Sequence, residues 1–349
     1  MRVTLVVLSW NGSACLRECL TAVLSQQHVE AEVLLVDNGS VDRSVPLVQQ
    51  HFPTVQVAQN RHNLGFSAGM NVGMRLLRQK PQPPDVIVLL NQDTVVAPDW
   101  LSHLLEPFSD QAVGAVGCKI YYPDQRTLQH AGGIIEPGRA MTRHFGYGER
   151  DQGQYNQPRD LEFLTAAALA LRMTALDKIG LFDEGYSPAY YEDGDLCWRL
   201  RRAGYRLRYQ PTATLYHAES RSTRDMLRRS TLMHRNRLRF VVKTFPEERI
   251  WADFFTAECA RMAAIPDSTE ARTLRRAYLE GSLRIEEWLT ARAQYQALPT
   301  ATAQRLRRLC TDLRSAISSF QGCGLSDNDD LPGRVPIAAN QLQRELPGR

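Results

Sequence analysis

The sequence predicts an α/β fold in which a mostly parallel, Rossmann-like sheet is followed by a C-terminal helical extension. Short apolar runs alternate with segments of helical periodicity over the first 110 residues. These runs are apolar on both faces, which is typical of parallel strands that helices cover on both sides. Beyond residue 245 the pattern is helical throughout, with prolines separating the segments.

Each strand of the sheet is expected where an apolar run ends in turn residues, at residues 3–9, 33–36, 55–58 and 86–90. Between the first two runs, apolar residues at helical spacing from Leu16 to Leu24 predict an amphipathic helix with Ser13 as its N-cap. The later pattern comprises an apolar run at 163–173, a helical turn at 174–179, a helix at 196–203 and an alternating, strand-like run at 212–216.

The composition is that of a globular protein with an uneven charge distribution. The 349 residues are 43% hydrophobic and 23% charged, which excludes collagen-like, coiled-coil and wholly disordered classes. The formal net charge is only +4, yet residues 199–243 hold 13 basic and 2 acidic side chains. This basic stretch contains no helix-turn-helix or zinc spacing, so we expect pyrophosphate or anionic lipid, or plain solvent, to face it rather than nucleic acid.

The sequence also bears on the cellular compartment. Seven cysteines form no C-x-x-C pair, which favours a reduced, cytoplasmic environment. No segment approaches the ~18 apolar residues of a membrane-spanning helix. Contact with a membrane is therefore expected to be peripheral, on the inner face of the cytoplasmic membrane, with the helix at residues 224–243 as the hypothetical lipid-facing element.

Two carboxylates follow strands of the predicted sheet. Asp37 ends the second apolar run, and Asp93 comes shortly after the run at 86–90. Either one alone is as well explained as a helix N-cap. Because open parallel sheets bind ligands outside the carboxyl ends of their strands, the two together indicate a ligand site.

The glycines of residues 63–73 recur at every fourth position from Gly65. This spacing differs from the G-x-G-x-x-G dinucleotide fingerprint. One interpretation is a helix whose glycines pack close to the sheet. The other is a loop in which Gly65 and Ser67 let a base or a sugar approach the backbone.

A second group of candidates lies further along the chain. Glu192 and Asp193 are adjacent carboxylates, and one of the two is expected to have a raised pKa suited to a general base. As an alternative, they only favour the dipole of the following helix. His217 ends a strand-like run, where a histidine is usually a surface residue, but beside Asp93 it would complete a site for Mn or Mg.

In their order along the chain, five segments resemble inverting family 2 glycosyltransferases, most closely the rhamnosyltransferase-like branch. The resemblance covers roughly residues 1–245 and implies a nucleotide-diphosphate-sugar transferase fold of the GT-A type. Its motifs are VVLSWNG (6–12), VDNGS (36–40), NLGFSAGMN (63–71), LNQDT (90–94) and YEDGDLCWR (191–199).

The resemblance also implies roles for individual residues. Asp93 and His217 would hold a divalent metal, Mn or Mg, on the donor diphosphate. Asp193 would be the catalytic base of a single inverting displacement, with Glu192 as the second candidate. Because the metal motif reads Asn91-Gln92-Asp93 instead of D-x-D, its single carboxylate should hold the metal less tightly. The implied donor-binding residues are Asn11, Asp37, Asn38, Gly65, Phe66, Asn71, Asn91 and Arg199.

The expected function is therefore transfer of a sugar, with rhamnose from dTDP-rhamnose as the first candidate, to a cell-surface polysaccharide or a lipid-linked glycan. One alternative is a UDP-sugar-dependent enzyme that acts on a protein or a small molecule. From another class, the alternative is a non-catalytic basic module that binds nucleic acid or membrane. We expect a catalytic domain at 1–245, a helical extension at 246–320 and a mobile tail at 321–349.

Overall fold

A computed structural model describes residues 1–218, 226–264 and 269–321. The chain divides into two compact units. Unit 1 comprises Met1–Ile135 and Thr142–Arg221, and unit 2 comprises Glu136–Met141 and Ser222–Arg349. Residues 322–349 of the predicted tail lie outside the described residues.

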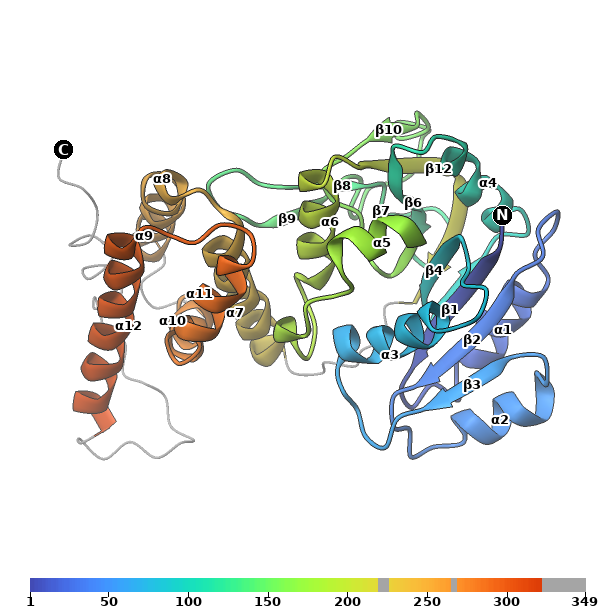
Figure 1. The fold of residues 1–349 in the computed structure, drawn as a ribbon, viewed down its shortest axis with the longest axis horizontal. Coiled ribbons are helices and arrows are strands. Elements are labelled where there is room, and N and C mark those ends of the chain that lie inside the picture. Colours follow the sequence, from blue (N-terminus) through green and yellow to red (C-terminus); the bar gives the residue numbers. More distant parts are fainter. Residues whose placement is uncertain (219–225, 265–268, 322–349) are drawn as a thin grey trace. The chain divides into compact units, whose positions relative to one another are not determined.

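Unit 1 is built on a ten-stranded sheet (Figure 1). Of the eight strands on its main path, only β11 and β10 run against the others. The predicted mostly parallel sheet is thus confirmed. Along this path the strands are β10 (Arg159–Asp160), β12 (Arg206–His217), β6 (Val113–Tyr121), β11 (Ala168–Arg172), β4 (Val86–Asn91), β1 (Val3–Ser9), β2 (Glu32–Asp37) and β3 (Gln56–Gln59).

Four short strands complete unit 1. β5 (Thr94–Val96) pairs with β12, and β7 (Leu128–His130) pairs with β6. β8 (Gly133–Ile135) and β9 (Thr142–His144) form a separate antiparallel pair. β5 pairs with the last residues of β12, and β7 pairs with the last residues of β6.

Helices cover both faces of the sheet, as the doubly apolar strands predict. Within β1, Leu5 and Val7 are buried in one core layer and Val6 in the other. The first layer includes side chains of α1 (Leu16–Leu24), α2 (Ser44–His51) and α4 (Trp100–Leu105), and the second includes those of α3 (Phe66–Arg78), α5 (Met173–Ile179) and α6 (Glu192–Arg202).

One predicted helix cap and one predicted helix start are wrong. α1 spans the predicted residues, but Cys15 occupies its N-cap, no side chain caps it, and Ser13 donates its backbone N–H to Asp42 Oδ2 (3.0 Å). The predicted helix at 196–203 begins earlier, at Glu192. The first turn of α6 therefore carries the acidic residues, where they favour the positive end of the helix dipole.

The glycines of α3 allow this helix to lie directly on the sheet. A Cβ atom built on Gly73 would lie 2.8 Å from Val6 Cγ1 and 2.9 Å from Val36 Cγ2. A Cβ atom on Gly69 would lie 2.7 Å from Leu8 Cδ1. The interpretation of this glycine pattern as a close helix–sheet contact is confirmed.

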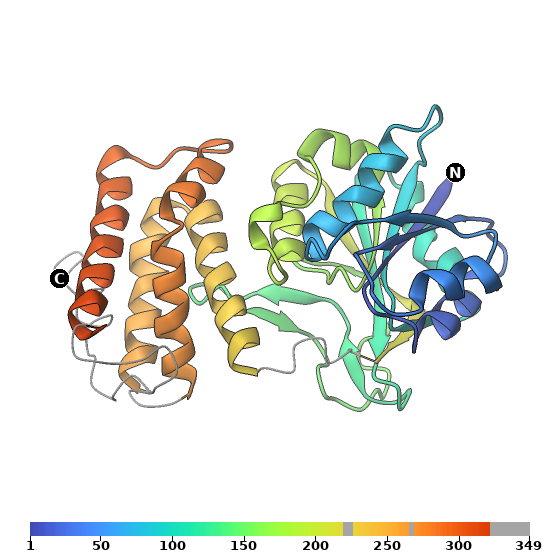
Figure 2. The ribbon, with the colours of Figure 1, turned by 90° about the horizontal axis from the view of Figure 1, so that it is seen from below.

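Unit 2 contains the predicted helical extension. Helix α7 packs against α10 and α11, and α12 packs against α10 and α11 (Figure 2). The long segment of unit 2 begins at Ser222 and therefore contains α7. The functional boundary at residue 245 stays a prediction. Its helices are α7 (Met226–Thr244), α8 (Glu247–Arg249), a π-helical turn (Ile250–Phe255), α9 (Thr256–Ala264), α10 (Thr269–Ser282), α11 (Ile285–Ala293) and α12 (Thr300–Gln321).

Most basic side chains of α7 are buried inside unit 2. Arg237 is fully buried and forms an ion pair with the equally buried Glu258. Arg235, Arg239 and Lys243 are buried as well. The hypothesis of a lipid-facing helix is wrong for these four residues, since they do not reach the surface. No described helix is long and apolar enough to span a membrane.

The close α3 contact predicts an unusual effect of Gly73→Ala. In an ordinary helix interior this change stabilises a protein by roughly 0.5–1 kcal/mol. Here the added methyl group overlaps Val6 and Val36, so we expect a loss of about 1–3 kcal/mol in the free energy of unfolding. Urea denaturation measures it, with Leu76→Ala on the exposed face of α3 as the control. Stabilisation by Gly73→Ala would contradict the packing.

Candidate active site

The register of the parallel strands brings the predicted residues to one edge of the sheet. Ser9 at the end of β1 is the partner of Asp37 at the end of β2. On the other side of β1, Leu8 is the partner of Asn91 at the end of β4. β12 reaches the same region, since His217 is the partner of Thr94 in β5.

Asp37 is buried with one of its carboxylate oxygens unsatisfied. Its Oδ2 accepts a hydrogen bond from the backbone N–H of Ser40 (3.2 Å). Its Oδ1 accepts none from the described residues, although the side chain is only 2% exposed. Leaving a buried acceptor unpaired costs about 1–3 kcal/mol. The arrangement suits a ligand that brings a hydroxyl or N–H donor.

The loop after β1 is fastened to the loops around it. Asn11 has a left-handed backbone (φ 50°), and its Oδ1 accepts from the N–H of Val41 (2.9 Å). Gln92 Oε1 accepts from Ser9 Oγ (2.7 Å) and from the N–H of Trp10 (3.1 Å). Gln92, in the middle of the N-Q-D motif, thus fastens this loop, a role that its position in the motif alone does not indicate.

Asn38 holds the loop before α3. Its side chain uses both donors and accepts two hydrogen bonds inside the protein, so it shapes the position of Gly65 and Phe66. Phe66 in turn donates its N–H to Pro188 O (2.7 Å). The Asn38 side chain donates to Asn63 Oδ1 and Gly65 O (3.0 Å each) and accepts from Asn60 Nδ2 and the N–H of Leu64 (3.1 Å each).

Asn71 connects α3 to the segment before α6. Its Nδ2 donates to Phe182 O and Glu184 Oε1 (2.9 Å each), and its Oδ1 accepts from the N–H of Phe182 (3.0 Å). These contacts make Asn71 and Asn38 positioning residues in the protein as described. A direct contact of either with a sugar donor stays a prediction.

The two predicted metal ligands lie side by side. Asp93 Oδ1 is 3.2 Å from His217 Nε2, and the side chains are 6% and 10% exposed. On the far side of the ring, Gln129 Oε1 lies 2.6 Å from His217 Nδ1. An amide oxygen only accepts, so Nδ1 carries the proton. Nε2 then faces Asp93 Oδ1 with its lone pair, and Asn91 Nδ2 lies 3.4 Å from the same nitrogen.

This donor set fits a divalent cation that is shared with a substrate. Mg²⁺ and similar ions are commonly held by one or two carboxylates together with substrate phosphates and water. Within the described part of the chain, no group of three or more His, Cys, Asp or Glu side chains is placed to hold a metal ion. Asp93 and His217 would thus leave most of the coordination sphere to a ligand.

The acid pair at the start of α6 is electrostatically unusual. Burial, and then the charge of Asp193, raises the pKa of Glu192 well above its usual range. Burial also raises the pKa of Asp193 to about 6, although Gly194 N–H (2.8 Å) and Ala166 N–H (3.3 Å) donate to its carboxylate. Because the two carboxyls are adjacent and desolvated, a negative charge on both at once is unfavourable, which suits a site that takes up a proton.

A short backbone segment joins the acid pair to the end of β4. The N–H of Ala166 donates to Asp193 Oδ2 (3.3 Å), and the carbonyl of Ala167 accepts from the N–H of Asn91 (2.9 Å). Before Glu192, Tyr190 and Tyr191 both adopt left-handed backbone (φ 81° and 72°). Such conformations are costly for tyrosine and occur preferentially at functional sites.

Arg199 has structural partners. Its Nε donates to Asp195 Oδ2 (2.7 Å), and its Nη1 donates to the carbonyl of Ile179 at the end of α5 (2.9 Å). The side chain is 3% exposed. These contacts hold α6 against α5, and a contact of Arg199 with a diphosphate stays a prediction.

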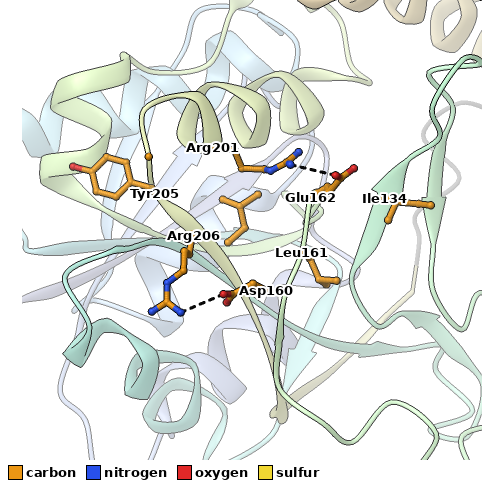
Figure 3. A pocket seen from close by; sticks show the side chains of 9 residues that line it. Ile134, Asp160, Leu161, Glu162, Arg201, Tyr205 and Arg206 are labelled. Carbon is orange, nitrogen blue, oxygen red and sulfur yellow. Dashed lines mark hydrogen bonds and ion pairs between the residues drawn. The ribbon is translucent and has the colours of Figure 1, made fainter. Parts of the chain in front are cut away.

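Figure 3 shows a surface pocket of unit 1 that is lined by Asp160, Leu161, Glu162, Arg201 and Arg206, among others. None of the predicted site residues lines it. Its charged side chains pair with one another, Arg201 with Glu162 and Arg206 with Asp160, each at 3.2 Å. The pocket therefore contributes nothing to the candidate active site.

Residues 4–180 match the family described as Glycosyl transferase family 2, and the chain belongs to this family. The resemblance inferred from the motifs is thus confirmed. The fold agrees with solved glycosyltransferases: S. aureus TarS 1-349 has a TM-score of 0.52 at 14% identity, covering 96% of this chain and 95% of that one. GalNAc-T7 has a TM-score of 0.57 at 14% identity, covering 82% and 57%.

Curated relatives include rhamnosyltransferases. The N-acetylglucosaminyl-diphospho-decaprenol L-rhamnosyltransferase of Mycobacterium tuberculosis is 27% identical over 62% of this chain and 76% of that protein. The O-antigen chain rhamnosyltransferase RfbN of Salmonella typhimurium is 24% identical over 66% and 70%. The pre-mycofactocin glycosyltransferase of M. tuberculosis is 28% identical over 65% of this chain. The chain spans 25% of the first relative, an uncharacterized protein of Sinorhizobium fredii, and 45% of the pre-mycofactocin enzyme.

The raised pKa of Asp193 predicts a pH-dependent gain in stability from Asp193→Asn. Ionising this carboxyl in the folded protein costs stability, because its pKa is about 6 instead of the ordinary 3.8. The cost is absent below pH 3.8, grows as the pH rises and is complete above about pH 6. The gain in Tm over the natural protein should therefore be larger at pH 7.5 than at pH 4.5. Glu30→Gln, at an exposed carboxylate, is the control, and an equal gain at both pH values would contradict the assignment.

Proposed function

We propose that this chain is an inverting, metal-assisted hexosyltransferase that moves a sugar from a nucleotide-diphosphate donor to a glycan or lipid-linked glycan acceptor. The observation that carries the proposal is that two pairs of side chains are connected through the end of β4. Asp93 and His217 form one pair, and Glu192 and Asp193 form the other. Ala166 donates its N–H to Asp193, and Ala167 accepts from the N–H of Asn91 in β4. This arrangement supports a carboxylate base close to a cation site.

The donor nucleotide is proposed to lie over the ends of β1 and β2. The unsatisfied Oδ1 of Asp37 would accept from the base or the ribose. Asn11 and Asn91 would line the same space, with Gly65 and Phe66 held at its border by Asn38. Asn71 would act through its contacts with Phe182 and Glu184.

In the proposed reaction, Asp193 takes the proton of the acceptor hydroxyl as that oxygen attacks the anomeric carbon. The new bond joins the acceptor oxygen to this carbon, and the bond from the carbon to the donor phosphate breaks on the opposite side, which inverts the configuration. A divalent metal bound by Asp93 and His217 would neutralise the charge on the leaving diphosphate. The raised pKa of Glu192, caused by burial and by the charge of Asp193, disfavours a second negative charge beside the proposed base.

The similarity to a decaprenol-linked rhamnosyltransferase and an O-antigen rhamnosyltransferase supports rhamnose as the first sugar to test and a polyprenyl-linked glycan as the first acceptor. A UDP-sugar-dependent reaction on a protein or small-molecule acceptor is the second candidate, and the similarity to a pre-mycofactocin glycosyltransferase bears on its acceptor only. The non-catalytic basic module is disfavoured, because Arg235, Arg237, Arg239 and Lys243 of α7 are buried. The proposal keeps a cytoplasmic location with peripheral contact to the inner, anionic membrane face.

Thermal unfolding with a panel of donors tests the substrate class. A donor at 100 times its Kd should stabilise the protein by about 2.7 kcal/mol. We expect dTDP-rhamnose to raise the Tm more in the presence of Mn²⁺ than in its absence, and a larger shift with UDP-sugars would favour the second candidate. The Asp37→Asn variant should lose much of the shift. Indifference to every donor, with or without Mn²⁺, would contradict the proposal.

Asp193→Asn tests the base. We expect it to lower the rate of sugar transfer by roughly 10²–10⁴-fold, because the acceptor hydroxyl loses the group that takes its proton. Donor binding, measured by the same thermal shift, should persist. Glu30→Gln is again the control. Full transfer activity in Asp193→Asn would remove Asp193 as the base and would leave Glu192 as the candidate.

A further inference from the structure

A buried glutamine lies behind His217. Gln129 in β7 is 8% exposed, and its Oε1 is 2.6 Å from His217 Nδ1. Backbone pairing fixes the positions of β7, which carries Gln129, and β12, which carries His217. β6 pairs with β7 through Ile120 and His130 and with β12 through Tyr121 and Tyr216. The contact is thus built into the sheet.

The amide oxygen of Gln129 determines whether His217 Nε2 carries a proton or presents a lone pair to Asp93. It only accepts hydrogen bonds, so it favours the ring form with the proton on Nδ1. Without this acceptor, the proton would move to Nε2 and donate to Asp93 Oδ1, which lies 3.2 Å away. That hydrogen bond would occupy both proposed metal ligands.

In this position Gln129 contributes little to the stability of the folded protein. Its Nε2 is buried and donates to no acceptor among the described residues. An unpaired buried donor costs about 1–3 kcal/mol, comparable to what one hydrogen bond returns. An apolar side chain of the same length would serve the core as well, so the contact with His217 distinguishes glutamine from such a residue.

We propose that Gln129 is a positioning residue that holds His217 in its Nδ1–H form, so that Nε2 and Asp93 bind one divalent cation together. The inference rests on the metal site of the proposed function. A neutral amide, in place of a carboxylate behind the ring, leaves Asp93 as the one formal negative charge of this trio. Groups that orient a metal-binding histidine typically change metal affinity 10–100-fold when they are replaced.

Titration of the full chain with Mn²⁺, followed by the electron paramagnetic resonance of free Mn²⁺, tests the proposal. Gln129→Met keeps the length of the side chain but removes the acceptor, and we expect roughly 10–100-fold weaker binding. Gln129→Glu keeps an acceptor and should bind Mn²⁺ at least as tightly as the natural protein. Gln210→Met, at a buried glutamine of β12 that bonds Glu106 instead, is the matched control and should leave binding unchanged.

Unchanged Mn²⁺ binding in Gln129→Met, or equally weak binding in Gln129→Glu, would overturn the inference alone. No Mn²⁺ binding by the natural protein would overturn the metal site of the proposed function and this inference with it. Nitrogen NMR of ¹⁵N-histidine-labelled protein gives a readout independent of affinity. It should show His217 with its proton on Nδ1 in the natural protein and on Nε2 in Gln129→Met, and the same form in both would overturn the proposal.

Discussion

The position of β4 between β1 and β11 is the constraint on which the candidate site depends. β4 runs parallel to β1 on one side and antiparallel to β11 on the other. Its end therefore lies next to the end of β1, one strand away from Asp37 at the end of β2, and next to the Ala166–Ala167 backbone, which binds Asp193. A shift of β4 against β1 would move Asp93 relative to Asp37, and a shift of β4 against β11 would move it relative to the Ala166–Ala167 backbone.

Electrostatics make this edge of the sheet incomplete without a ligand. Asp37 has a buried oxygen with no donor among the described residues, and Asp93 Oδ1 faces a histidine nitrogen. Glu192 is buried and Asp193 is half-buried beside it, and desolvation raises the pKa of both. Each feature costs stability in the protein alone and is relieved by a hydroxyl donor, a cation or a proton. A nucleotide-diphosphate sugar, a divalent metal and an acceptor hydroxyl supply these three.

The sequence predicted the elements that local pattern determines. β1, β2 and β4 begin and end within one residue of the apolar runs because these strands are buried on both faces. Asp37 and Asp93 were found because they follow such strands. Gln129 was not, because its role depends on the pairing of β6 with two strands that lie far apart in the chain. The lipid-facing hypothesis for Arg237 in α7 failed for the same reason, since its tertiary ion pair with Glu258 accompanies its burial.

The central claim is that the end of β4 holds a metal-bound nucleoside diphosphate. A crystal of the full chain soaked with Mn²⁺ and dTDP, measured at the manganese absorption edge, tests it most directly. The account predicts an anomalous peak within ligand distance of both Asp93 Oδ1 and His217 Nε2, with the base beside Asp37. A nucleotide bound elsewhere, or a manganese peak without contact to these two side chains, would contradict it.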